Sequence, residues 1–247
     1  MPGVLLIQAQ NVDTVIDINA NALPIMNNIF WHIYGMNHWK QIVEEQLSTI
    51  INSGLLNKIN NIYVTFIGNN QNDIDWLTSI DSKIILDKFD SNPHHYEKLC
   101  LHSLLEWSKY NSSNVLYIHS KGVSRPNNEN VQNWRRLMEY FLIEQHETCI
   151  QKLNEGHDAV GCLLTNGGKS VKIHQENHKY HFSGNFWWSK TDYIRSLPRI
   201  PDIDLSQNKN YWLCERWILY YYTSIKVHIM YENKNKHYYN FSPQNYK

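Results

Sequence analysis

The stretch Asn114-Val-Leu-Tyr-Ile-His-Ser-Lys-Gly-Val-Ser124 decides the fold. Its apolar run, Val115 to Ile118, ends abruptly in the polar sequence His119-Ser-Lys-Gly122. A buried strand has this pattern when it leaves a sheet, and ligands of α/β proteins bind at the carboxyl ends of such strands. His119 and Lys121 therefore predict a site for an anion such as a phosphate, and Gly122 allows a ligand to come close. A solvated strand exit with an exposed lysine is the alternative.

Apolar periodicity on either side of this stretch predicts alternating strands and helices. Strands are expected at 28–34, 62–67, 83–86, 115–118, 159–164 and 226–231, with a strand or turn at 182–189. Helices are expected at 39–53, 96–107, 134–153 and 211–221. This order predicts one α/β, Rossmann-like domain with a mixed central sheet and helices on both faces. Residues 1–27 are expected to form a peripheral N-terminal segment.

Composition excludes several classes of protein. The 247 residues carry 23 Lys plus Arg and 23 Asp plus Glu, so no global charge attracts nucleic acid. The four cysteines form no CxxC pair, which argues against a zinc site or a disulfide framework and favours a reduced, cytoplasmic setting. The apolar run at 4–7 is far too short to span a membrane, and no signal peptide is expected.

A second motif, His181-Phe-Ser-Gly-Asn-Phe-Trp-Trp188, combines polar groups with aromatic rings. Ser183 and Asn185 offer hydrogen bonds, Gly184 permits a close approach, and a tryptophan suits the apolar face of a sugar. Because side chains alternate along a strand, Trp187 and Trp188 face opposite ways, so one of them at most lines a site. The alternative is a core strand with two packed tryptophans.

A third motif places Glu215 among aromatic and apolar residues in Cys214-Glu-Arg-Trp217. Such a carboxylate either faces solvent, with Arg216 as its companion, or points into a cleft as a base. The pattern alone favours the solvent face.

Other candidate groups carry weaker signals. The two Asp-x-Asp sequences, at 73–75 and 202–204, follow no β-branched run and lie in loop-like text, so a metal role is not expected. The paired histidines at 94–95 and at 174 and 178 are interpreted as solvated. Trp134-Arg-Arg136 predicts a core tryptophan, with Arg135 or Arg136 on a helix face and able to reach a phosphate.

Together, these motifs resemble a family of glycosyltransferases found in bacteria and large DNA viruses. The resemblance spans about residues 28–220. It rests on 30–34, 53–55, 96–97, 116–123, 133–138, 181–188 and 215–217, which occur in one consistent order. It implies a GT-A-like fold, with a nucleotide-sugar-binding half at 28–165 and an acceptor-binding half at 166–247.

The resemblance also implies roles for individual residues. In the nucleotide pocket it places His32, Tyr34, Tyr96 and Glu97, with the last two near the base or ribose. At the diphosphate it places His119, Ser120, Lys121 and Gly122. Against the transferred sugar or the acceptor it places His181, Ser183, Gly184, Asn185 and Trp187. Glu215 is the candidate base. The implied partners are a nucleotide-sugar donor, with UDP as the expected nucleotide, and a glycan or glycoprotein acceptor.

One departure from the GT-A pattern concerns the metal. GT-A enzymes commonly carry Asp-x-Asp at the end of the fourth strand, where two carboxylates hold a divalent ion on the diphosphate. Here that place reads His119-Ser-Lys121, so a lysine supplies positive charge where the metal would. No cofactor is therefore expected; a Mn²⁺ or Mg²⁺ ion held by His119 and a distant carboxylate is the alternative.

Two functions remain open at this point. The first is a hexosyl- or N-acetylhexosaminyl-transferase that uses Lys121 for the leaving group and Glu215 for the acceptor proton. The second is a catalytically inactive nucleotide- or carbohydrate-binding module on the same fold, which the missing Asp-x-Asp favours and Glu215 argues against. Inversion and retention of configuration are both compatible with the motifs.

Overall fold

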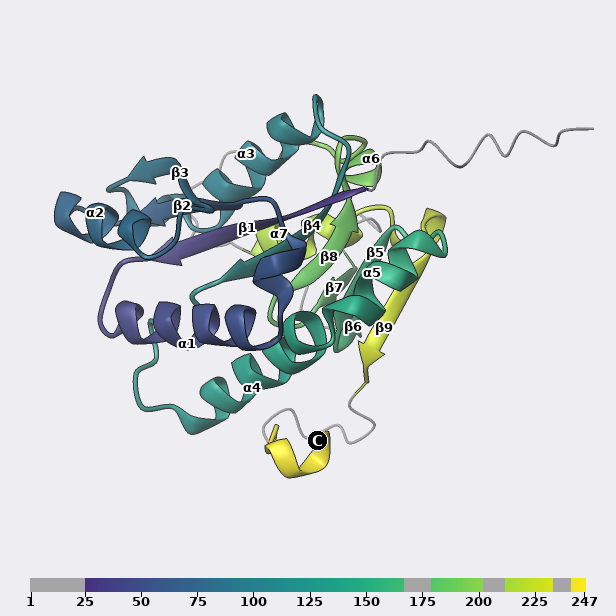
Figure 1. Ribbon diagram of the computed structural model, residues 1–247. Helices are drawn as coiled ribbons and strands as arrows, with labels where there is room; N and C mark the ends of the chain where they lie inside the picture. The colour runs from purple at the N-terminus through teal and green to yellow at the C-terminus, as the bar shows by residue number, and fades with distance from the viewer. Residues whose placement is uncertain (1–24, 167–178, 202–211, 233–240) are drawn as a thin grey trace, which may run out of the picture.

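The computed structural model describes residues 25–166, 179–201, 212–232 and 241–247. Its first half alternates strands and helices, as the sequence predicts (Figure 1). In chain order these are β1 (Met26–Tyr34), α1 (Trp39–Asn52), β2 (Ile62–Ile67), α2 (Gln71–Ser79), β3 (Ile84–Asp90), α3 (Lys98–Ser108) and β4 (Ser113–His119). Gly54, with φ +77°, follows α1 in the left-handed conformation that often ends a helix.

The second half has shorter and less regular elements. The chain continues through α4 (Glu129–Glu139), a π-helical turn (Tyr140–Glu144), α5 (His146–Asn154), β5 (Ala159–Cys162) and β6 (Leu164–Asn166). Then follow β7 (Tyr180–Phe182), β8 (Trp187–Lys190), α6 (Thr191–Ile194), α7 (Trp212–Arg216) and β9 (Val227–Tyr231). Short 3-10 turns occupy Leu55–Lys58, Pro93–His95, Trp217–Leu219, Tyr222–Ser224 and Pro243–Asn245.

The main sheet is mixed, which confirms the predicted fold class. Its strand order is β3-β2-β1-β4-β8-β5-β9. Strands β1 to β4 run parallel, β8 is antiparallel to both β4 and β5, and β9 is parallel to β5. The register of β1 on β4 pairs His32 with His119, so both strands deliver a histidine to the same edge of the sheet.

Helices cover both faces of this sheet (Figure 1). One core cluster contains Trp31 and Trp188 and packs against α1, α4 and α5. The other contains Tyr117 and Trp187 and packs against α3, α6 and α7. The alternation of Trp187 and Trp188 is therefore confirmed, because the two rings enter different clusters.

Several elements differ from the prediction. Helix α2 (Gln71–Ser79) was not predicted, and the single helix predicted at 134–153 is divided by a π-helical turn into α4 and α5. The strand predicted at 159–164 ends at Cys162, because Leu163 has φ +56° and redirects the chain. Residues Leu164–Asn166 then pair with β7 in a separate two-stranded sheet. The third strand extends to Asp90, and the helix predicted at 211–221 is reduced to α7 followed by 3-10 turns. Position 211 itself lies outside the described residues.

The structure also describes the state of the cysteines and the character of the helices. All four cysteines are free and buried. Within the described residues, no helix combines the length and the apolar character that a membrane span requires.

Candidate functional site

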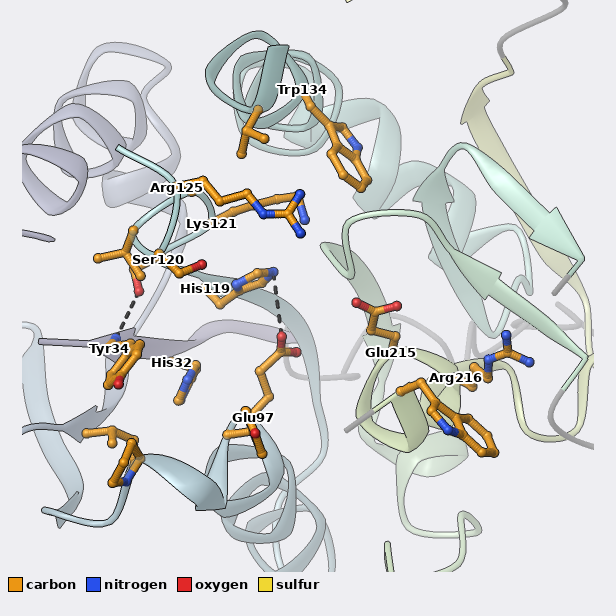
Figure 2. Close-up of a pocket in the computed structure, with 18 residues that line it drawn as sticks. His32, Tyr34, Glu97, His119, Ser120, Lys121, Arg125, Trp134, Glu215 and Arg216 are labelled. Carbon is orange, nitrogen blue, oxygen red and sulfur yellow. Dashed lines mark hydrogen bonds and ion pairs between the residues drawn. The ribbon is translucent and has the colours of Figure 1, made fainter. Parts of the chain in front are cut away.

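A pocket of about 680 Å³ opens at the carboxyl ends of β1 and β4. Its walls include His32 and Tyr34 on β1, Ile67 on β2, Tyr96 and Glu97 before α3, the turn 119–125, Trp134 on α4, and Glu215 on α7. Pockets for small ligands have about this volume, in the range of roughly 300–1,000 Å³. Figure 2 shows these side chains converging on one space from different elements.

The residues that the resemblance implies for the nucleotide and the diphosphate meet in this pocket. All of them line it, namely His32, Tyr34, Tyr96, Glu97, His119, Ser120, Lys121 and Gly122. Glu215 lines it as well, so the sequence pattern that favoured its solvent face is wrong, because α7 turns this carboxylate inward. Tyr96 has φ +46° and ψ −143°, a strained backbone conformation for a residue other than glycine.

The motif at 181–188 supports the pocket from behind. Trp187 is 0% exposed and stacks on Tyr117 at 5.0 Å, its neighbour across β4 and β8. The prediction that Trp187 contacts a sugar is therefore wrong, because the ring lies in the core between the sheet and α7. His181, Ser183, Gly184 and Asn185 do not line this pocket either.

Ser120 attaches the turn after β4 to the end of β1. Its backbone N–H donates to the carbonyl of His32 at 3.0 Å, and its Oγ accepts from the N–H of Tyr34 at 2.9 Å. The backbone N–H and the hydroxyl oxygen of Ser120 are therefore both engaged by β1, so Ser120 contributes to the pocket by holding the turn in place. Gly122, with φ +96°, then turns the chain sharply toward α4.

Three side chains fix the carbonyls of the same turn. Gln46 Nε2 donates to the His119 carbonyl at 3.2 Å, Arg135 Nη1 to the Lys121 carbonyl at 3.1 Å, and Asn37 Nδ2 to the Val123 carbonyl at 2.9 Å. Each bond satisfies a backbone acceptor that a loop would otherwise leave to water. The turn is consequently held from the side of α1 and α4, and its side chains project into the pocket.

Arg135 is a structural residue in this arrangement. It is 2% exposed, its Nη2 is paired with Glu45, and its Nε lies 3.2 Å from Glu139 Oε1. Burial raises the pKa of Glu139 to about 7, although Arg135 opposes that rise. Arg136 is exposed. The prediction that one of these arginines reaches a phosphate is wrong, since neither lines the pocket.

Two other arginines line the pocket: Arg216 on α7, and Arg125, which no sequence motif singled out. Arg125 lies beside Lys121, and Figure 2 shows the ends of both side chains converging on the same space. Lys121 Nζ also lies 3.8 Å from the centre of the Trp134 ring, whose plane stacks on Phe241 at 5.9 Å. We call Lys121 and Arg125 the cationic wall.

The environment of Lys121 is electrostatically mixed. Burial lowers the pKa of its ammonium, Glu215 and Glu97 raise it, and Arg125 lowers it again, with a lowered pKa as the net result. Two cations placed side by side repel each other, and an anion between them relieves this repulsion. The cationic wall is therefore suited to bind a phosphate or a diphosphate.

Glu97 faces the pocket from below the cationic wall (Figure 2). Its Oε2 accepts hydrogen bonds from the Tyr117 hydroxyl, at 3.0 Å, and from Asn185 Nδ2. Its Oε1 lies 3.8 Å from His119 Nε2. Burial raises the pKa of Glu97, but His119, His32 and the two hydrogen bonds lower it by more, so the carboxylate stays ionised.

Both histidines of the pocket are neutral near pH 7. Burial lowers the pKa of His32 to about 4 and also lowers the pKa of His119. His119 Nε2 lies 2.9 Å from the carbonyl of Gly184, which only accepts, so Nε2 carries the proton. A neutral histidine with this tautomer keeps Nδ1 as an acceptor, which suits a hydroxyl or a metal better than a phosphate oxygen.

Glu215 lies across the pocket from the cationic wall (Figure 2). Burial and then Glu97 raise the pKa of its carboxyl, while Lys121 and Arg216 lower it, with a raised pKa as the net result. The Arg216 guanidinium points away from this carboxylate, and its centre lies 5.1 Å from the Trp212 ring. We call Glu97 and Glu215 the acidic wall.

The residues of the pocket do not fit a metal bridging a diphosphate. Lys121 and Arg125 bring two cations to the end of β4, and Glu97 Oε2 is already used by two donors. The described residues contain no group of three or more His, Cys, Asp or Glu side chains that could hold a metal ion. Of the two Asp-x-Asp sequences, 73–75 lies in α2 with Asp73 paired to Lys40 at 3.0 Å, and 202–204 lies outside the described residues.

Among the described histidines, the pair His94 and His95 does not line the pocket. His94 is exposed, and the side chain of His95 is 43% exposed and hydrogen-bonded through Nδ1 to Asp90 Oδ2 at 2.7 Å, so both imidazoles reach solvent. Positions 174 and 178 lie outside the described residues.

Fold and pocket together define an α/β protein with a mixed sheet and a polar cleft at its strand ends. A family model described as "Domain of unknown function (DUF8361)" matches residues 27–236, and the chain belongs to this family. No curated protein matches the chain.

Several solved structures are similar over most of their length. The chain is 13% identical to 4-diphosphocytidyl-2C-methyl-D-erythritol synthase from Anaerococcus prevotii, with a TM-score of 0.47, covering 85% of this chain and 90% of that chain. Another such synthase is 9% identical, with a TM-score of 0.43 and coverage of 86% and 91%. HddC from Yersinia pseudotuberculosis is 9% identical, with a TM-score of 0.42 and coverage of 84% and 91%. At these values the similarity carries no argument about activity.

Proposed function

We propose that the protein is a glycosyltransferase that moves a sugar from a nucleoside diphosphate to an acceptor hydroxyl. The observation that carries the proposal is the pairing of Lys121 and Arg125 on one side of the pocket, with Glu215 opposite. Cations suit the diphosphate of a donor, and a carboxylate across from them suits the acceptor side. The resemblance of the sequence motifs to glycosyltransferases supports the same reaction.

In this proposal the two walls act on opposite ends of the reaction. The bond between the anomeric carbon and the phosphate oxygen breaks, and its electron pair leaves with the diphosphate, whose growing charge Lys121 and Arg125 stabilise. The acceptor oxygen forms the new bond to the anomeric carbon and gives its proton to Glu215. Burial raises the pKa of Glu215, which brings this base closer to neutral pH.

The proposed donor is a UDP-sugar, and the proposed transferred group is a hexose or N-acetylhexosamine. The nucleoside would lie toward the end of β1, where His32, Tyr34 and Tyr96 line the pocket. A thermal-shift panel of UDP-, GDP-, CMP- and dTDP-sugars tests the donor, because a ligand that binds only the folded state raises its apparent stability.

Two substitutions separate binding from turnover. Lys121→Ala is expected to weaken nucleoside diphosphate binding by about tenfold or more, because a charge-assisted contact is lost. Lys109→Ala, which removes an exposed lysine paired with Glu106 outside the pocket, serves as the matched control. Glu215→Gln is expected to lower turnover while leaving nucleotide affinity nearly unchanged. Unchanged affinity in Lys121→Ala would refute the assignment.

We further propose that transfer requires no divalent metal, since Lys121 supplies the positive charge. Turnover measured with and without EDTA tests this point. Complete loss on chelation, restored by Mn²⁺, would contradict it. Nucleotide-sugar binding without turnover on any acceptor, and without donor hydrolysis, would instead favour a catalytically inactive binding module.

A further inference from the structure

We infer that the acidic wall selects donors whose transferred sugar carries no negative charge, and that Glu97 is the principal residue of this selection. The class excluded is sugars with a carboxylate, such as uronic acids. The inference rests on the proposed function, because it assumes that the diphosphate occupies the cationic wall. It assigns Glu97 a place at the sugar rather than at the base or ribose.

The position of Glu97 supports this assignment. Its carboxylate is 17% exposed, approaches His119 at 3.8 Å and is hydrogen-bonded through Asn185 to the turn before β8. Glu97 acts electrostatically on both Lys121 and Glu215, which places all three charges in the same part of the pocket. Figure 2 shows Glu97 pointing from the N-terminal end of α3 toward the space that the two walls enclose.

The two walls interact with different parts of a donor: the cationic wall with the diphosphate and the acidic wall with the sugar. A diphosphate brings about two negative charges, which Lys121 and Arg125 balance. Binding therefore uses up the cations that would otherwise offset Glu97 and Glu215. A sugar carboxylate placed next would meet two further carboxylates, and like charges in a partly buried site are costly. Arg216 also lines the pocket and acts on Glu215, but its guanidinium points away from that carboxylate, toward the Trp212 ring.

A neutral sugar has the hydrogen bonds that this wall can use. Both donors to Glu97 approach Oε2, so its Oε1 faces His119 and the pocket. A rigid carboxylate oxygen is an acceptor for sugar hydroxyl groups, and neutral His119 adds a second acceptor at Nδ1. Because Tyr117 and Asn185 already hold the carboxylate in place, little conformational entropy is lost when a hydroxyl binds.

The test compares two donors that differ only in charge at one carbon of the sugar. Isothermal titration calorimetry measures the affinity of the full chain for UDP, UDP-glucose and UDP-glucuronic acid. UDP-glucose is expected to bind at least about tenfold more tightly than UDP-glucuronic acid. In Glu97→Gln this ratio is expected to fall to about threefold or less. Glu106→Gln, which changes an exposed carboxylate on α3, the helix that Glu97 caps, is expected to keep the wild-type ratio.

The outcomes separate this inference from the proposed function. If UDP and both sugars bind, and UDP-glucuronic acid binds as tightly as UDP-glucose, the charge selection is wrong while the donor site stands. If the wild-type ratio is large but Glu97→Gln leaves it unchanged, Glu97 is not the selecting residue. If neither UDP nor either sugar binds, both proposals are overturned. The wild-type comparison requires no variant to fold.

Discussion

The two walls of the pocket are built in opposite ways. Lys121 and Arg125 lie on a single turn, whose backbone is held by hydrogen bonds from Gln46, Arg135 and Asn37. Glu97 caps the N-terminus of α3 and Glu215 belongs to α7; the two lie far apart in the sequence and meet through long-range packing. Two like charges can be kept adjacent by one rigid turn. The acidic wall instead depends on the correct packing of α3 and α7 against the sheet.

The largest effect is expected from breaking the support of the cationic wall. Arg135→Met leaves Glu45 and Glu139 without their buried partner, and we expect a loss of about 3 kcal/mol or more in the free energy of unfolding. Urea unfolding at pH 8 measures it. Arg136→Ala, an exposed neighbour on the same helix, should change stability by no more than about 0.5 kcal/mol.

The same variant has an internal check. The pKa of Glu139 is raised to about 7 in the intact protein, and removing Arg135 raises it further. At pH 6 Glu139 is then protonated in the variant, so the loss of stability should be smaller than at pH 8. An equal loss at both pH values would contradict the buried ion pair.

The next effect concerns how buried His32 makes the free energy of unfolding depend on pH. The pKa of His32 is lowered from 6.5 to about 4, so below pH 6.5 the unfolded chain binds a proton that the folded chain does not. This stability is complete above pH 6.5 and is lost as the pH falls toward 4, by about 3 kcal/mol at most. His32→Leu should flatten the curve of unfolding free energy against pH, and His94→Gln, at an exposed position, serves as the surface control.

A smaller effect is expected behind the acidic wall. Gly184 has φ +95°, and a methyl group there would lie 2.4 Å from Met138 Sδ and 3.0 Å from Trp134 Nε1. Gly156, with φ +92°, has nothing within 4 Å of the same position and isolates the backbone cost. Gly184→Ala should therefore destabilise by about 1–3 kcal/mol more than Gly156→Ala. Equal thermal shifts of the two variants would show that this turn is not closely packed.

The smallest effect concerns one hydrogen bond to Glu97. Tyr117→Phe removes the hydroxyl that donates to Oε2 at 3.0 Å, and we expect a loss of about 1–2 kcal/mol in unfolding free energy. Tyr110→Phe is the control, because Tyr110 is 87% exposed. If both substitutions behave alike in chemical denaturation, the carboxylate does not need this donor, and the acidic wall is less rigid than proposed.

The cationic wall was partly predictable because its signal is contiguous. An apolar run followed by His119-Ser-Lys-Gly122 predicts a buried strand and a polar exit, and the structure has both. Arg125 was missed because a polar loop gives no periodicity that would orient its side chain. The loop is positioned beside the pocket by hydrogen bonds from Gln46, Arg135 and Asn37 to the carbonyls of residues 119, 121 and 123, and these are tertiary contacts.

The supporting residues were assigned the wrong contacts for a related reason. Trp187, Gly184 and Asn185 form a motif that suits a sugar, yet Trp187 stacks on Tyr117 and Asn185 binds Glu97. Local sequence reports the hydrogen-bonding capacity of these groups but not their partners. The break of β5 at Leu163 was equally hidden, because its N–H bonds to Tyr231, which lies far along the chain.

The sequence by itself determined the α/β alternation, the mixed sheet and the polar end of β4, because strand and helix periods are local properties of the chain. Tertiary structure alone decided that Glu97 and Glu215 face the same space and that Arg125, rather than Arg135, joins Lys121. Electrostatic coupling depends on distance and burial, and both arise only when elements far apart in the sequence pack together.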